Sequence, residues 1–174
     1  MNKKIKDKIY SFNYKKIMHN IILFESNPDF SDNTRAVFDE MLRRNYNDKF
    51  KLIWFVDDEK KYRKIKIRNV KFITYNSTII SRIRCGFYNL FAKYIIDCNK
   101  LIYKRNKDQI RFYLSHGAII KEPVEYFKTL GNVDYILEIS DIFKNEYKKL
   151  FNVKNENIIT LGFPRNDYIF CQQN

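Results

Sequence analysis

Short apolar runs recur along the chain and are separated by polar, turn-forming residues. Continuous apolar runs of this length are typical of strands that are buried on both faces, as in a parallel sheet. The pattern predicts seven strands, over residues 20–26, 50–56, 70–74, 94–98, 109–115, 134–139 and 157–161.

Between these runs, apolar residues recur at helical spacing. One helix is expected over 34–45, with Ser31 or Asp32 as its cap. A second is expected over 78–91, and a third is capped by Ser140 or Asp141 and ends at Leu150. A short helix is expected after Glu122-Pro123. In the second helix, four apolar residues share the face that is expected to meet the sheet: Ile79, Ile83, Phe87 and Leu90.

This alternation of strands and helices predicts an α/β fold, a Rossmann-like parallel sheet with helices on both faces. A chain of 174 residues is long enough for one such domain, which we expect over 19–174. Residues 1–18 form a basic leader with a weak amphipathic pattern. Two interpretations stay open for this leader, a loosely packed end and a segment that lies on an anionic membrane.

Charge adds a second constraint, because the formal net charge is +13. Such a charge favours polyanionic partners, namely nucleic acid, an anionic membrane face or a phosphate polymer, although a solvated lysine-rich surface explains it equally well. The aromatic residues fall at core spacing inside the predicted elements instead of interleaving with Lys and Arg. We therefore expect no nucleic-acid partner.

Cysteine usage and hydropathy indicate the compartment. The three cysteines, Cys85, Cys98 and Cys171, have no C-x-x-C spacing, which argues against zinc and a disulfide framework. The sequence has no apolar run long enough to span a membrane and no signal-peptide pattern. A cytoplasmic protein is expected, with peripheral association at the inner face of the membrane left open.

The candidate chemistry lies where the strand over 109–115 ends in His116 and Gly117, with Lys121 four residues later. Side chains at the carboxyl ends of parallel strands face the crevice in which α/β sheets bind ligands. A neutral imidazole can act there as a general base, and Lys121 offers a partner for phosphate. A histidine that only satisfies structural hydrogen bonds is the alternative. The familiar Gly-rich nucleotide motifs do not occur.

Three motifs, in order, resemble one known family. Ser-His-Gly-Ala-Ile-Ile-Lys at 115–121 resembles the His-Gly-Thr-Pro-x-Lys motif of the CDP-glycerol glycerophosphotransferases, which build the poly(glycerol phosphate) chains of teichoic acids. Gly-Phe-Pro-Arg-Asn-Asp at 162–167 matches a second motif of that family, and the segment from Glu25 to Glu40 resembles its early Glu-Ser and Asp-Asn segment.

The resemblance implies the first domain of a two-domain GT-B-type enzyme, the half that approaches the acceptor polymer. CDP-glycerol is then the donor substrate, no cofactor or catalytic metal is needed, and His116 is the general base. The resemblance also implies a set of substrate-binding residues, of which Lys121 and Arg165 are the natural anion partners: Ser26, Asn33, Gly117, Lys121, Arg165, Asn166 and Asp167.

Two departures from the family pattern change what we expect of this chain. Ala118 and Ile119 replace the usual Thr-Pro, and the sequence stops at Asn174, where the family continues into the domain that binds CDP-glycerol. We expect the donor-binding domain to be absent or on a second polypeptide, so that a lone, truncated chain would not complete the transfer. The alternative is a non-catalytic basic module that binds a polyanionic polymer or an anionic membrane surface.

Overall fold

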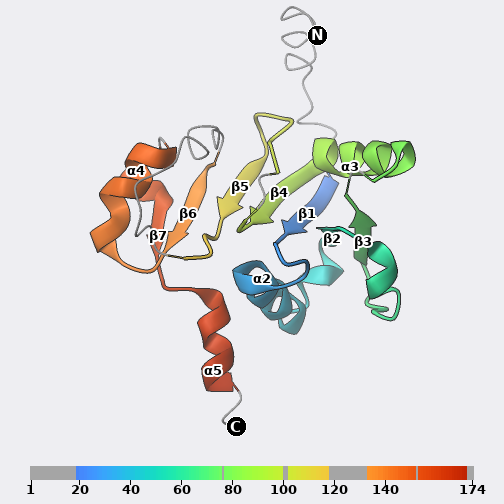
Figure 1. Cartoon of the computed structure of the whole chain (residues 1–174), viewed down its shortest axis with the longest axis horizontal. Helices are drawn as coiled ribbons and strands as arrows, with labels where there is room; N and C mark the ends of the chain where they lie inside the picture. The colour runs from blue at the N-terminus through green and yellow to red at the C-terminus, as the bar shows by residue number, and fades with distance from the viewer. Residues whose placement is uncertain (1–18, 76, 100–101, 118–132, 152, 172–174) are drawn as a thin grey trace, which may run out of the picture.

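A computed structural model describes residues 19–75, 77–99, 102–117, 133–151 and 153–171, and shows one seven-stranded sheet (Figure 1). Its strand order is β3-β2-β1-β4-β5-β6-β7, and every neighbouring pair is parallel. The strands are β1 (His19–Glu25), β2 (Lys51–Val56), β3 (Val70–Thr74), β4 (Ala92–Asp97), β5 (Ile110–Tyr113), β6 (Tyr135–Glu138) and β7 (Ile158–Thr160). The predicted Rossmann-like fold is thereby confirmed.

In the described residues, four α-helices and five 3₁₀ turns lie between and after these strands. The helices are α2 (Asp32–Arg43), α3 (Ile79–Phe91), α4 (Lys144–Phe151) and α5 (Asp167–Cys171). The turns are η2 (Tyr46–Asp48), η3 (Glu59–Tyr62), η5 (Asp141–Phe143), η6 (Asn155–Asn157) and η7 (Pro164–Asn166). The helix expected after Pro123 lies outside the described residues, as do the leader 1–18 and Lys121.

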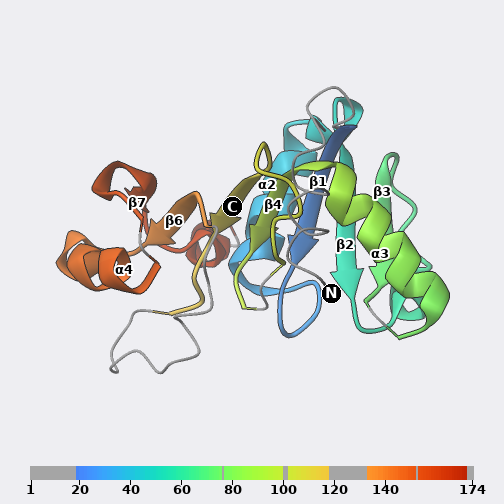
Figure 2. The same cartoon turned by 90° about the horizontal axis from the view of Figure 1, so that it is seen from above.

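Helices cover both faces of the sheet, as expected (Figure 2). Alternate residues of a strand point to opposite faces, and the core divides accordingly. On one face, α2 packs on Phe24, Trp54 and their neighbours. On the other face, α3 covers Leu23 and Ile53, and α4 covers the region around Ile136.

Local sequence explains where the helices begin. Ser31 is the N-cap residue of α2, and Thr78 caps α3 in a reciprocal pair with Ser81. Ser140 caps the η5 turn that leads into α4. The side chains of Thr78 and Ser140 accept from backbone N–H groups that have no partner inside the helix, whereas the Ser31 side chain makes no such hydrogen bond. The predicted caps Ser31 and Ser140 are confirmed as N-cap residues, although α2 runs over 32–43 instead of 34–45.

The orientation of α3 differs from the prediction. Its buried residues are Ser81, Cys85 and Asn89, with Tyr88 and Phe91 packed beside the core. The apolar residues that were expected to meet the sheet instead face outward, with Ile79 76%, Ile83 67% and Phe87 50% exposed. The prediction of the buried face was wrong because a helix of this composition has apolar residues on more than one side, and spacing alone does not tell which side the sheet covers.

A buried ion pair joins two central strands. Arg111 of β5 donates to both carboxylate oxygens of Asp97 in β4, at 2.8 and 3.3 Å, and both side chains are fully buried. The Asp97 carboxylate also accepts from the backbone N–H of Ile102. Burial of two charges is tolerated only when they satisfy each other, so this pair constrains how β4, β5 and the segment after β4 are arranged.

Candidate active site

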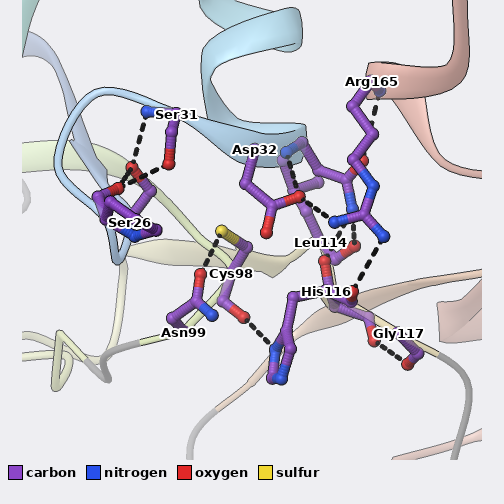
Figure 3. A network of polar contacts seen from close by, with 12 residues as sticks. Ser26, Ser31, Asp32, Cys98, Asn99, Leu114, His116, Gly117 and Arg165 are labelled. Atoms are coloured by element: carbon purple, nitrogen blue, oxygen red, sulfur yellow. Dashed lines mark hydrogen bonds and ion pairs between the residues drawn. The ribbon is translucent and has the colours of Figure 1, made fainter.

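The candidate site lies at the carboxyl edge of the sheet, where the order of connection reverses. From β1 the chain continues to β2 on one side, while β4 continues to β5 on the other, so the crevice between β1 and β4 is a topological switch point. Open α/β sheets bind ligands at such points. Ser26 follows β1, Cys98 follows β4, and His116 follows β5, which brings these residues to one edge (Figure 3).

The imidazole of His116 is held in one tautomer. Its Nδ1 atom lies 3.0 Å from the carbonyl oxygen of Cys98. A carbonyl oxygen only accepts hydrogen bonds, so in the neutral ring Nδ1 carries the proton and Nε2 keeps a free lone pair. The side chain is exposed at the sheet edge. A ring in this state can take a proton from a substrate hydroxyl at Nε2.

The backbone around His116 is fixed from two directions. Asn33 of α2 donates from Nδ2 to the carbonyl oxygen of Ser115 at 2.7 Å, and to that of Leu114 at 3.3 Å. Arg165 of η7 donates from Nη2 to the carbonyl oxygen of His116 at 3.0 Å. Two residues far apart in the sequence thus bind adjacent peptide groups, and His116 cannot move without breaking their hydrogen bonds.

A third contact holds Gly117. The Ser115 hydroxyl lies 2.9 Å from the carbonyl oxygen of Gly117 and 2.9 Å from the Tyr147 hydroxyl, which itself lies 3.2 Å from that carbonyl. Ser115 has a φ of 50°, a left-handed conformation that costs a non-glycine residue energy. The contacts with Gly117 and Tyr147 offset this cost and keep the turn in place.

Asp32 supports the guanidinium of Arg165. Its Oδ1 atom accepts from Nη1 of Arg165 at 2.5 Å and from the backbone N–H of Asn33 at 2.8 Å. The side chain of Asp32 is only 13% exposed, whereas that of Arg165 is 38% exposed. In addition, the backbone N–H of Arg165 donates to Oδ1 of Asn33. The η7 turn is therefore anchored on the first turn of α2 beside His116 (Figure 3).

Two of the groups that flank the histidine, the Cys98 thiol and the Tyr147 hydroxyl, stay uncharged at neutral pH. Burial raises the pKa of the Cys98 thiol to about 12, so Cys98 contributes its carbonyl oxygen to His116 and not a thiolate. Burial also raises the pKa of the Tyr147 hydroxyl above its ordinary value, which keeps this group a proton donor. The turn is thus held by neutral donors and by one paired arginine.

The other residues that were predicted to bind substrate do not all lie beside His116. The Ser26 hydroxyl donates to the Pro28 carbonyl and accepts from the Ser31 N–H, so it closes the loop before α2. Asn166 and Asp167 are exposed. Asp167 lines a groove of about 760 Å³ that runs between the outer side of α2 and the start of α5. Asn33, Gly117 and Arg165 are brought to His116, whereas Ser26 and Asp167 serve other parts of this edge.

Three contributors to the site were missed by sequence reasoning. Tyr147 and the carbonyl of Cys98 have no sequence signal, because Tyr147 contacts Ser115 across 32 positions and the carbonyl belongs to the backbone. Asp32 was expected only as a helix cap, and its pairing with Arg165 bridges 133 positions. The match of 162–167 to the family motif pointed to Arg165 but not to its partner.

Two classes of feature are not found in the described part of the chain. No cluster of three or more His, Cys, Asp or Glu side chains there is arranged to hold a metal ion. Likewise, none of the helices in those ranges has both the length and the apolar character needed to span a bilayer.

The structure is a Rossmann-like α/β domain with its candidate site at the carboxyl edge of a parallel sheet. The chain belongs to the CDP-glycerol:poly(glycerophosphate) glycerophosphotransferase family, whose model matches residues 8–174. This confirms the resemblance noted from the motifs.

Solved structures of the wall teichoic acid polymerase TagF share the fold. One has a TM-score of 0.69 at 16% identity and covers 98% of this chain and 45% of its own. A variant of the polymerase with one histidine replaced by alanine has a TM-score of 0.70 at 17% identity, with 98% and 46% covered. The chain thus spans less than half of the polymerase chains that it matches.

A curated relative from Leptotrichia wadei (strain F0279), described as the CRISPR-associated endoribonuclease Cas13a, is 26% identical over 144 residues. The match covers 82% of this chain but 11% of that protein. At this identity and coverage it shows neither a shared family nor a shared fold.

Proposed function

We propose that this chain is the acceptor-side part of a glycerophosphotransferase of teichoic acid synthesis. In this account it transfers glycerol phosphate from CDP-glycerol to the terminal hydroxyl of a lipid-linked or polymeric glycerol phosphate acceptor. The observation that carries the proposal is the fixed tautomer of His116, whose Nε2 lone pair is available at the sheet edge. Family membership supplies the donor and the acceptor class.

The proposed step transfers the glycerol phosphate group to the acceptor oxygen. The acceptor hydroxyl gives its proton to Nε2 of His116 while its oxygen forms a bond to the β-phosphorus of CDP-glycerol. The bond between this phosphorus and the oxygen that bridges to the α-phosphorus breaks, and CMP leaves. Phosphoryl transfer requires mainly positioning and charge stabilisation from the protein. Arg165 keeps His116 in place, and Lys121, outside the described residues, remains the proposed partner of the phosphate.

The proposal also covers the metal requirement, the donor site and the residues that contact the acceptor. It requires no catalytic metal, and it assigns the CDP-glycerol site to a second domain or polypeptide. Open space lies beside Gly117, since a Cβ added there would meet nothing within 4 Å, and the proposal places the approaching acceptor in this space. Asn166 and Asp167 are proposed to contact the acceptor polymer from the exposed η7 and α5 segments.

The test is extension of a lipid-linked glycerol phosphate primer by the purified chain, with and without the donor-binding part of a family member. We expect primer extension that requires His116 and that is unchanged by EDTA. Extension that persists in His116→Ala would remove the catalytic role of this residue. A requirement for added divalent cation would remove the metal-free mechanism.

One observation favours the second candidate, a basic module that binds an anionic surface or polymer. Four cationic side chains, against the single carboxylate of Glu59, line a groove of about 340 Å³ beside the edge strand β3: Arg63, Lys66, Lys71 and Arg84. This function does not exclude catalysis at His116, because the groove belongs to a different part of the sheet.

A further inference from the structure

The described helices leave one face of the sheet open over β4, β5 and β6. Tyr94, Phe112 and Tyr135 point to the face that α2 covers over β1 and β2, and all three are only half-buried. On the other face of the same strands, residues such as Ile95 and Ile136 are fully buried. Parallel strands inside a sheet are normally buried on both faces. The open face therefore has room for a further layer.

The side chains on this open face form a continuous apolar row across the strands. Ring centroids lie 5.9 Å apart for Phe50 and Tyr94, 6.5 Å for Tyr94 and Phe112, and 5.0 Å for Phe112 and Tyr135. Ile159 of β7 packs on the same side of the core. These five residues are called the aromatic face below. A contiguous apolar patch of this kind marks an interaction site.

The aromatic face adjoins the groove of about 760 Å³ between α2 and α5. Tyr46 lines this groove, and its ring lies 6.4 Å from that of Phe50. Val37 and Met41 line the groove from α2 and pack against the core on the same side of the sheet. Tyr168 of α5 lines it from the opposite side. Apolar surface is thus continuous from α5 to the open strands.

The topology explains why this face is open. From β4 to β7 the chain moves in one direction along the sheet, away from β1. Right-handed crossovers place all the connections of such a series on the same face. α4, which leads from β6 to β7, lies on the face opposite to α2 (Figure 2). A segment from outside this series is therefore needed to cover the aromatic face.

The leader 1–18 is positioned to be that segment. It continues directly into β1, whose first residue, His19, is paired with Ala92 at the start of β4. So short a tether corresponds to a local concentration in the millimolar range. A second copy of the chain would instead have to bind from solution against a net charge of +13. The tether therefore favours the leader as the occupant.

The length and the pattern of the leader also fit. As a helix, 18 residues would extend about 27 Å, whereas the four strands from β4 to β7 span about 14 Å. Ile5, Ile9 and Phe12 follow one another at intervals of four and three residues, which gives such a helix one apolar stripe. The family model begins at residue 8 and so already includes Ile9 and Phe12.

We propose that the leader 1–18 forms an amphipathic helix that packs its stripe of Ile5, Ile9 and Phe12 onto the aromatic face. The leader is then a layer of the folded domain, on the same side of the sheet as α2. It also supports the groove wall that contains Pro164 of η7, the turn in which Arg165 contacts His116. The proposal goes beyond the transferase reaction and does not depend on it.

The test is hydrogen exchange of the leader amides in the full chain. Amides of residues 5–14 should exchange at least roughly tenfold more slowly than the same amides in a synthetic peptide of residues 1–18. Phe112→Ser/Tyr135→Ser should return them to the peptide rate, because the surface beneath the leader is removed. Ile83→Ser/Phe87→Ser is the matched control on the outward side of α3, and it should leave the protection unchanged.

A second variant tests the same contact without a change inside the sheet. Ile5→Ser/Ile9→Ser should raise the equilibrium constant of unfolding in urea at least roughly tenfold for each isoleucine, because both side chains lose buried apolar area. Ile142→Ser/Leu161→Ser is the matched control, since both of these side chains are 82% exposed, and its unfolding constant should equal that of the wild type.

Several outcomes would overturn the proposal. Leader amides of the wild type that exchange at the peptide rate would do so, as would Ile5→Ser/Ile9→Ser with an unchanged unfolding constant. Protection that persists in Phe112→Ser/Tyr135→Ser would place the leader on another surface. An unprotected leader, together with self-association in light scattering that is lost in Phe112→Ser/Tyr135→Ser, would identify a second copy as the occupant.

Discussion

The guanidinium of Arg165 joins Asp32 to the backbone of His116, with Nη2 3.0 Å from the His116 carbonyl oxygen and Nη1 2.5 Å from Oδ1 of Asp32. The arginine of the Pro-Arg-Asn-Asp motif thus already has two protein partners before any substrate binds. Its first role, on this geometry, is to position His116. A phosphate would have to share the guanidinium with these partners.

This relationship predicts the effect of Arg165→Lys. A lysine keeps the charge but lacks the planar fork that bridges Asp32 and His116. Loss of one hydrogen bond to a charged group corresponds to about 1.5–3 kcal/mol, so kcat should fall roughly 10- to 100-fold, with KM for the acceptor little changed. Steady-state kinetics measures both values. Arg68→Lys, in the exposed segment before β3, is the control that should leave them unchanged.

A different outcome would assign Arg165 another role. If Arg165→Lys raised KM for the acceptor and left kcat intact, the residue would bind substrate directly, and its contact with the His116 carbonyl would be incidental.

The tautomer of His116 is open to direct measurement, because the chain contains only two histidines. In ¹⁵N-histidine spectra at a pH where the ring is neutral, His116 should show a protonated Nδ1 and an unprotonated Nε2. His19 provides the second signal, and His116→Ala assigns the two. A predominant Nε2–H tautomer for His116 would contradict the hydrogen bond to Cys98.

Alkaline pH should destabilise the fold in part through Cys98. The folded-state pKa of this thiol is raised from 9.0 to about 12 by burial, so above about pH 9 the unfolded chain binds fewer protons than the folded one. Stability is then lost as pH rises from about 9 to about 12, by about 1.4 kcal/mol per pH unit for this group. Buried Tyr113 and Tyr147, whose pKa values are also raised, add to the loss above about pH 10.

Urea unfolding of wild type and Cys98→Ala between pH 8 and about 10 separates the contribution of Cys98, since the tyrosines are common to both proteins and their contribution cancels. The variant should lose less stability over this interval than the wild type does. If the free energy of unfolding fell equally with pH in both proteins, the Cys98 thiol would ionise equally well in the folded and unfolded states, contrary to its burial.

The sequence was sufficient for most of the fold and for little of the site. Runs such as 50–56 predict strands because both faces of a parallel sheet are apolar, and β2 is buried from Leu52 to Val56. The capping residues Ser31 and Ser140 mark helix starts through purely local chemistry. Each of these signals lies within a few consecutive residues, so it can be recognised in a single sequence.

Features that depend on contacts between distant residues could not be predicted from the sequence in this way. The inward face of α3 is decided by Cys85 and Asn89, whereas its isoleucines suggested the opposite face. Tyr147 touches Ser115 across 32 positions, and no pattern in either segment signals this pair. The position of His116 at a strand end was predictable, but the hydrogen bonds that fix its ring and backbone come from four separate elements.

The buried Asp97–Arg111 pair should matter strongly for stability. Arg111→Met would leave the Asp97 carboxylate buried with only the Ile102 N–H as a donor, at an expected cost of about 3–5 kcal/mol. Asp97→Asn/Arg111→Met removes both charges and should recover a large part of this loss. Urea unfolding of the two variants tests the pair. If the free energy of unfolding of Arg111→Met lay within about 1 kcal/mol of the wild-type value, the pair would not matter strongly for stability.

The central claim is that His116 takes the proton of the acceptor hydroxyl. The most direct measurement is the rate of CMP release from CDP-glycerol in the presence of a lipid-linked glycerol phosphate primer and the donor-binding part. Wild type and His116→Ala are compared, with His19→Ala as the matched histidine control. We predict a loss of roughly 100-fold or more in His116→Ala and none in His19→Ala. Equal CMP release from wild type and His116→Ala would contradict the account.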